Sequence, residues 1–261
     1  MRSRFLLAAL CTLSMSIMSV SAHAAGSLCA SGTRLTADGR ILGFDFILQA
    51  STGWYQFEAV VGRSYSVEVR DDIEDDNGDL NPVTLTTGCG GAAVTIHSTT
   101  QLDPVIAANA FRGSFTATAS GPVNISVPNA NVSLGRYVAI SVSDTTLFNP
   151  RWSTFSGFVT QYGFQNTTAG AITGKLTVTP VLGSVASPVT ITVNVPANGE
   201  VFVIVGAANT SDIVIAPSHA GYAVFSHNGP PGGLVTDAYF INPSATVIVP
   251  AVFQPVRDKS H

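Results

Sequence analysis

Six acidic side chains between residues 71 and 79 form the densest group of chemically capable residues in the chain. They are Asp71, Asp72, Glu74, Asp75, Asp76 and Asp79, with Asn77 and Gly78 among them. Carboxylates packed this closely repel one another, and a hard cation such as Ca²⁺, which takes about six to eight oxygen ligands, relieves that repulsion. The pattern therefore predicts a calcium site, with the ligands Asp72, Asp75, Asp76 and Asp79.

A second interpretation of this segment needs no metal. In an EF-hand alignment that uses Gly78 as the loop glycine, Ile73 falls at the first ligand position, and only Asp75 and Asn77 stand where the pattern wants them. Asn-Gly is a strong turn signal, so the segment also fits a solvated hairpin tip kept soluble by its charges. The sequence leaves both interpretations open.

Cysteine usage predicts one disulfide. Of the three cysteines, Cys11 lies in the N-terminal leader described below, which leaves Cys29 and Cys89. Two cysteines in an oxidising compartment usually pair. No histidine lies within a few residues of either thiol, so a zinc site at these cysteines lacks further ligands. We expect a bond between Cys29 and Cys89.

No catalytic motif stands in the sequence. It contains no Gly-x-Ser-x-Gly, His-Glu-x-x-His or Ser-x-x-Lys pattern. His219 and His227 are eight residues apart, which is not a metal-ligand spacing such as His-x3-His. We therefore expect a protein that is not an enzyme, although a triad assembled from distant residues needs no local motif.

Trp152 and Arg151 are the candidate partner contacts. They follow Asn149-Pro150, a sequence typical of a loop. An exposed Trp beside an Arg suits stacking on a sugar or packing against a protein. The alternative places Trp152 as a plug between two packed domains.

The first 25 residues resemble a secretory signal peptide. Arg2 and Arg4 precede an apolar run over residues 5–20, and Ala22-His23-Ala24 provides a small-residue cleavage site. We therefore expect a cleaved leader over residues 1–25 and a mature protein that is secreted or periplasmic. No later stretch has the ~20 consecutive apolar residues of a membrane span.

Composition predicts an all-β protein that does not bind nucleic acid. Charged residues make up only 11% of the chain, and valine and threonine, which favour strands, are abundant. Loss of Arg2 and Arg4 with the leader leaves ten basic residues against 16 acidic ones, a net charge near −6 with neutral histidine. Nucleic-acid binding needs the opposite charge.

Short runs in which apolar and polar residues alternate predict the positions of the strands. Tyr65, Val67 and Val69 share one face of the run 64–70, and the turn 61–63 joins it to the run 54–60, which reads as a hairpin. Pro196-Ala197-Asn198-Gly199 predicts a second hairpin. Strand runs about 8–12 residues apart indicate sandwiches. We predict two tandem β-sandwiches, over residues 26–143 and 144–261.

The first of these units resembles bacterial pre-peptidase C-terminal-type domains. The resemblance is carried by the segment Gly53–Val69, with its Trp-Tyr-x-Phe, Gly and Tyr positions, and by the closing segment Gly135–Val142. It covers roughly residues 29–143 and implies a jelly-roll-like β-sandwich of a secreted protein. Such domains usually accompany an exported enzyme, and no catalytic domain follows here.

The second unit looks like uncharacterised domains of secreted bacterial proteins. The shared segments are Thr145–Pro150, Asn166–Thr168, Val195–Gly199 and His227–Gly232. This resemblance implies an immunoglobulin-like sandwich and no activity.

These observations predict an exported, non-catalytic binding or adhesion protein that contacts a surface glycan or a protein, with calcium stiffening one loop. The first alternative is a structural component of the cell surface that self-associates through low-charge β edges. The second is a hydrolase whose catalytic residues form no local motif.

Overall fold

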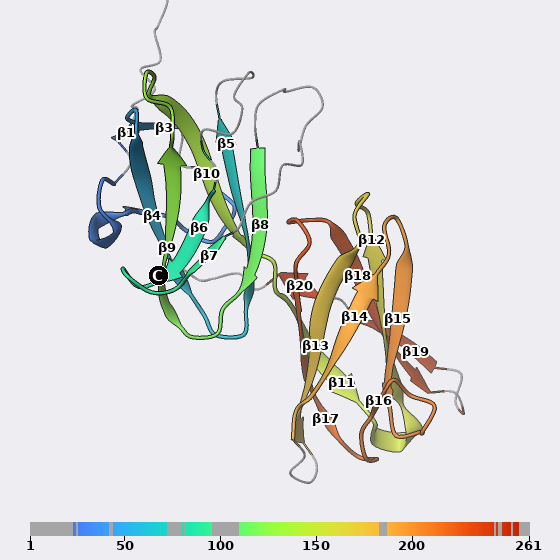
Figure 1. Cartoon of the computed structure of the whole chain (residues 1–261). Helices are drawn as coiled ribbons and strands as arrows, with labels where there is room; N and C mark the ends of the chain where they lie inside the picture. Colours follow the sequence, from blue (N-terminus) through green and yellow to red (C-terminus); the bar gives the residue numbers. More distant parts are fainter. Residues whose placement is uncertain are drawn as a thin grey trace, which may run out of the picture.

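The computed structural model of the protein is built from β-strands that form four five-stranded sheets (Figure 1). It describes residues 23–24, 26–41, 44–71, 80, 82–95, 110–182, 187–242, 244, 247–251 and 253–255. Besides strands and turns, these residues form two short 3-10 helices, η1 (Cys29–Ser31) and η2 (Phe155–Gly157). The all-β prediction is confirmed.

The first half of the chain is a jelly roll. Its strands are β1 (His23–Ala24), β2 (Thr33–Arg34), β3 (Phe44–Ile47), β4 (Ser51–Ala59), β5 (Ser64–Asp71), β6 (Thr84–Thr87), β7 (Ala93–Thr95), β8 (Ala110–Thr116), β9 (Gly121–Asn129) and β10 (Arg136–Asp144). They pair in the orders β1-β3-β10-β5-β8 and β2-β4-β9-β6-β7. The eight strands β3 to β10 are thus divided four and four between two sheets, as in the double Greek key of jelly-roll domains.

The predicted hairpin over residues 54–70 is wrong, although its strands and turn are where we expected them. Gly62 adopts φ +81° in the turn, a conformation that glycine adopts without strain. However, β4 pairs with β9 in one sheet and β5 pairs with β10 and β8 in the other. The turn therefore carries the chain across the core, and the buried faces of β4 and β5 pack against each other: the Phe57 and Tyr65 ring centroids are 5.0 Å apart.

The predicted disulfide is confirmed. Cys29 lies in η1 and Cys89 lies in the turn after β6, with their Cα atoms 5.7 Å apart and the two sulfurs bonded. The bond ties the beginning of the jelly roll to the sheet that contains β6.

The second half is a β-sandwich. Its strands are β11 (Leu147–Ser153), β12 (Val159–Asn166), β13 (Ile172–Leu182), β14 (Val189–Val195), β15 (Glu200–Gly206), β16 (Ile213–Val214), β17 (Ala220–His227), β18 (Leu234–Asn242), β19 (Val247–Ala251) and β20 (Gln254–Pro255). The sheets have the orders β14-β13-β17-β11-β20 and β16-β15-β12-β18-β19. We call the first of these the β13 sheet.

The central pairs of this sandwich are those of an immunoglobulin domain. The pairs β12–β15 and β13–β17 correspond to B–E and C–F. The flanking strands differ, because β11 lies beside β17 and β18 lies beside β12. The predicted hairpin at residues 196–199 is also wrong: the turn is present, but β14 and β15 belong to opposite sheets.

Hydrogen bonds fix the junction between the two halves. Thr145, directly after β10, donates its hydroxyl to the carbonyl oxygens of Ser64 at 3.1 Å and His227 at 2.9 Å. The Ser226 hydroxyl donates to the Gly62 carbonyl at 2.8 Å. The turn between β4 and β5 is therefore held against the end of β17, which places one half beside the other at the seam visible in Figure 1.

Candidate functional site

A cleft of about 1140 Å³ lies at this seam, which we call the junction cleft. One wall is the turn between β4 and β5, and the other is the outer face of the β13 sheet. The lining residues are Val61, Gly62, Arg63, Thr146, Phe148, Thr177, Thr179, Tyr222, Val224, Gln254 and Pro255. Junctions between domains are common places for ligand sites, because two surfaces meet there at an angle.

Strand alternation explains which side chains face the junction cleft. Ala223 and Phe225 are fully buried in the core of the second half. Tyr222 and Val224 therefore point outward from β17. The ring of Phe148, from the neighbouring strand β11, has its centroid 5.6 Å from that of Tyr222. The result is a half-buried aromatic pair beside the hydroxyls of the threonines on β13.

An ion pair holds Arg63, one of the residues that line the junction cleft. Arg63 Nη1 lies 3.1 Å from Asp144 Oδ2, and the backbone N–H of Thr146 donates to Asp144 Oδ1 at 2.9 Å. Burial raises the pKa of Asp144, and the hydrogen bonds from Thr146 and the charge of Arg63 oppose that rise. Asp144 therefore fixes one side of the guanidinium of Arg63.

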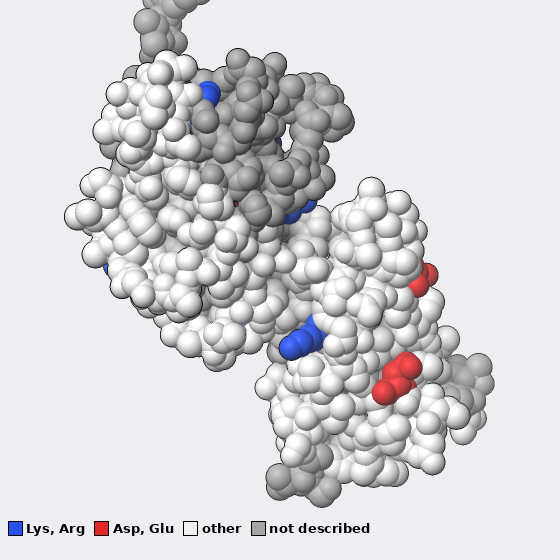
Figure 2. Space-filling model, viewed as in Figure 1, with Lys and Arg blue, Asp and Glu red and all other residues white. Residues whose placement is uncertain are grey.

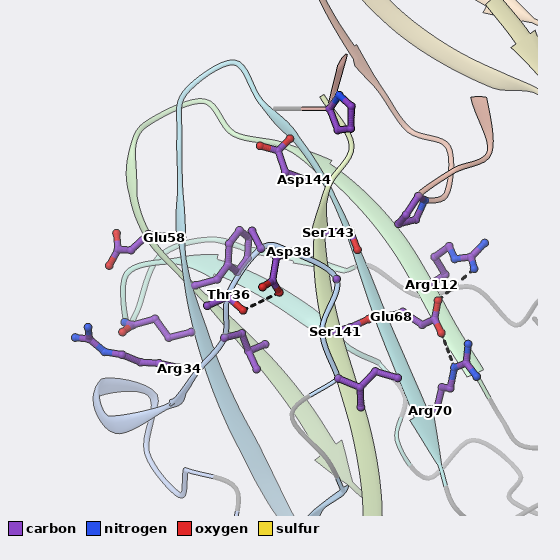
Figure 3. Close-up of a pocket in the computed structure, with 18 residues that line it drawn as sticks. Arg34, Thr36, Asp38, Glu58, Glu68, Arg70, Arg112, Ser141, Ser143 and Asp144 are labelled. Carbon is purple, nitrogen blue, oxygen red and sulfur yellow. Dashed lines mark hydrogen bonds and ion pairs between the residues drawn. The ribbon is translucent and has the colours of Figure 1, made fainter. Parts of the chain in front are cut away.

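A second hollow, of about 990 Å³, shares the lining residue Pro255 with the junction cleft. Figure 3 shows the side chains around this hollow. Glu68 accepts hydrogen bonds from Arg70 and, at 3.2 Å, from Arg112. Across the hollow, the Thr36 hydroxyl donates to Asp38 at 2.8 Å. Three arginines and four carboxylates line this hollow, so its charges nearly balance, and Glu68 pairs with two of the arginines, Arg70 and Arg112. Its described lining contains no histidine or cysteine that could act as a base or nucleophile.

His227 makes the stability of the second half depend on pH. Its ring is buried and stacks on Phe225 at 5.7 Å, and its Nδ1 accepts a hydrogen bond from the Gly229 N–H. Desolvation lowers the pKa of His227 from 6.5 to about 4. The unfolded chain takes up a proton on this ring as the pH falls through 6.5, whereas the folded protein does so only near 4.

We therefore expect acidification to destabilise the protein in that window. The stabilisation is complete above pH 6.5 and is lost as the pH falls towards 4, by about 3 kcal/mol. Asp144, whose pKa is raised, contributes a slope of opposite sign above pH 3.8. Urea unfolding of the wild type and of His227→Gln at pH 7 and pH 4.5 separates the contribution of His227 from that of Asp144. The free energy of unfolding should fall more between pH 7 and pH 4.5 for the wild type than for the variant. Equal falls would refute the role of His227.

The structure corrects the prediction for Trp152. Its side chain is 0% exposed and lies in the core of the second half, where Nε1 donates to the Tyr222 carbonyl at 3.0 Å. It is therefore neither an exposed partner contact nor a plug between the halves. Arg151 is exposed, and its guanidinium lies 6.0 Å from the centroid of the Phe240 ring. Strand β11 continues through Pro150 where the sequence suggested a loop.

The predicted calcium ligands Asp72, Asp75, Asp76 and Asp79 lie outside the described residues. The calcium prediction therefore stays a prediction. Within the described ranges, no group of three or more His, Cys, Asp or Glu side chains is arranged to hold a metal ion. Among those same residues no helix is long and apolar enough to span a membrane.

Sequence reasoning missed Phe148, Tyr222 and Thr177. A signal was present: the run of Thr173, Lys175, Thr177 and Thr179 alternates with apolar residues, which marks a polar outer face. Nothing in the sequence indicates that this face meets the turn at residues 61–63. No protein-family model matches the chain, and no curated protein matches it.

Proposed function

We propose that the protein is an exported, non-catalytic binding protein that holds a glycan in the junction cleft. The observation that carries this proposal is the aromatic pair of Phe148 and Tyr222 beside a row of threonine hydroxyls. A sugar ring has an apolar face of C–H groups and an edge of hydroxyls. Apolar lining with a few placed polar groups is the usual composition of a ligand site.

The polar groups of the cleft suit a ligand rich in hydroxyls. Thr177, Thr179 and Gln254 each supply both a donor and an acceptor. Arg63 supplies further N–H donors from a guanidinium that Asp144 already orients, so little side-chain entropy is lost when a ligand binds. Export rests on the leader pattern of residues 1–25.

Tyr222→Ala tests the proposal. The probes are the hexasaccharides of cellulose, chitin, xylan and amylose, with binding to the mature protein measured by calorimetry. We expect at least one of them to bind, and Tyr222→Ala to weaken that binding about tenfold, as for a buried aromatic anchor at an interface.

A matched control is available on the opposite sheet. Phe202 on β15 is 49% exposed and lies away from the cleft. Phe202→Ala removes a comparable aromatic surface and should leave binding unchanged. Equal losses in the two variants, or no binding of any hexasaccharide by the wild type, would refute a glycan site in the junction cleft.

A further inference from the structure

The junction cleft opens onto a row of hydrogen-bonding groups on the outer face of the β13 sheet. Thr177, which lines the cleft, lies opposite Thr190 with the two hydroxyl oxygens 2.9 Å apart. Two residues before Thr177 on β13, Lys175 lies opposite Thr192, and two residues before that the Thr173 hydroxyl donates to Asn194 Oδ1 at 2.9 Å. We call Thr173, Thr177, Thr190, Thr192 and Asn194 the hydroxyl ladder.

The side chains of the hydroxyl ladder are regularly spaced on strands whose opposite face is packed in the core. The alternate residues Leu176, Val178 and Val193 are buried in the core beneath it, which fixes the direction of every ladder side chain. A strand rises about 3.4 Å per residue, so the face extends about 20 Å from Thr179 in the cleft to Thr173. Neighbouring strands lie about 4.8 Å apart. The ladder thus continues the cleft as a narrow band.

The charge of this face favours a ligand without cationic groups. The described residues of β11, β13, β14 and β17 include Lys175 and Arg151 but no acidic side chain. In Figure 2 the acidic side chains visible on the second half lie towards β15 and β16, away from the seam. A chain of neutral sugars meets no repelling or unpaired carboxylate along the band.

We propose that the junction cleft and the hydroxyl ladder together bind an extended β-1,4-linked glycan chain. This inference rests on the proposed function and specifies its ligand. A β-1,4-linked chain is a flat ribbon with hydroxyls along both edges, so it lies along a flat strand face while one sugar ring stacks on Tyr222. An α-1,4-linked chain coils into a helix and leaves the band after one or two units.

The test compares oligosaccharides of increasing length. The probes are di- to hexasaccharides of cellulose and of chitin, with malto-oligosaccharides of the same lengths as α-linked controls. We expect affinity for one β-linked series to rise about tenfold from tri- to hexasaccharide, the equivalent of one or two further hydrogen bonds. The malto-oligosaccharides should show no gain with length.

Variants of the hydroxyl ladder test whether the rise in affinity with chain length comes from the ladder and not from the cleft. The change Thr173→Val/Thr190→Val/Thr192→Val removes three hydroxyls from a solvent-facing band and keeps the strand preference of β-branched residues. It should abolish the gain with length and leave disaccharide binding intact. Thr173→Ser/Thr190→Ser/Thr192→Ser keeps the hydroxyls and should keep the gain.

The outcomes distinguish the two proposals. If short β-linked sugars bind but their affinity does not rise with chain length, the hydroxyl ladder does not bind glycan. The proposal of a glycan site in the junction cleft would still stand. An equal rise in affinity with length for the malto-oligosaccharides would overturn the proposal that an extended β-1,4-linked chain binds along the ladder. A rise in affinity that survives in the valine variant would overturn it as well. Absence of binding for every probe would overturn the proposed function and this inference with it.

Discussion

Replacing both Cys29 and Cys89 by serine lowers the free energy of unfolding of the jelly roll by about 4 kcal/mol, the chain-entropy contribution of a disulfide that closes a loop of this length. The bond spans a sequence separation of 60 residues. Removing it frees that loop in the unfolded chain, while the jelly roll keeps its own core of Tyr55, Phe57 and Tyr65. Guanidinium unfolding of the oxidised wild type and the variant measures the difference.

The two tryptophans allow this loss to be assigned to one half. Trp54 lies in β4 and Trp152 lies in β11. In a Trp152→Phe background, fluorescence therefore reports on the jelly roll through Trp54. In this background the unfolding midpoint of the serine variant should lie at a lower guanidinium concentration than that of the protein with the disulfide. Identical transitions with and without the disulfide would show that the bond does not stabilise the fold.

Trp152→Ala destabilises the second half by about 3–5 kcal/mol, the usual cost of deleting a large buried aromatic side chain. The side chain is fully buried in the aromatic core that includes Tyr162 and Phe164. The substitution also removes the hydrogen bond from Nε1 to the Tyr222 carbonyl, and Tyr222 carries the aromatic wall of the cleft. Thermal melting followed by circular dichroism measures the effect.

Trp54→Ala is the matched control for this prediction. Trp54 is only half-buried and belongs to the jelly roll, so its loss should leave the melting of the second half unchanged. Trp152→Phe refills part of the space and should cost less than Trp152→Ala. If Trp152→Ala melts like the wild type, the residue does not lie in the core.

Local patterns predicted the local structure well. Tyr65, Val67 and Val69 were expected on one face and are each 1% exposed in the core. Their alternation is a property of neighbouring residues, so it can be read without knowing the fold. The disulfide was equally accessible, because only two cysteines remain once the leader is set aside.

The prediction for Trp152 failed for a different reason. Asn149-Pro150 is typical of a loop, but proline is tolerated on a strand where its missing N–H leaves no ladder bond unsatisfied. The register between β11 and β17 is irregular between Asn149 and Trp152. That irregularity accommodates Pro150 and turns Trp152 into the core.

The sequence by itself determined the all-β class, most of the strands, the turns and the disulfide, because each depends on residues close together or on a count. Only the tertiary structure decided how the strands pair. The turns at 61–63 and 196–199 reverse the chain, and a reversal is equally compatible with a hairpin or with a crossing to the opposite sheet. The junction cleft was beyond the sequence for the same reason: Arg63 meets the Phe148–Tyr222 pair of the second half only because hydrogen bonds from Thr145 and Ser226 hold the two halves together.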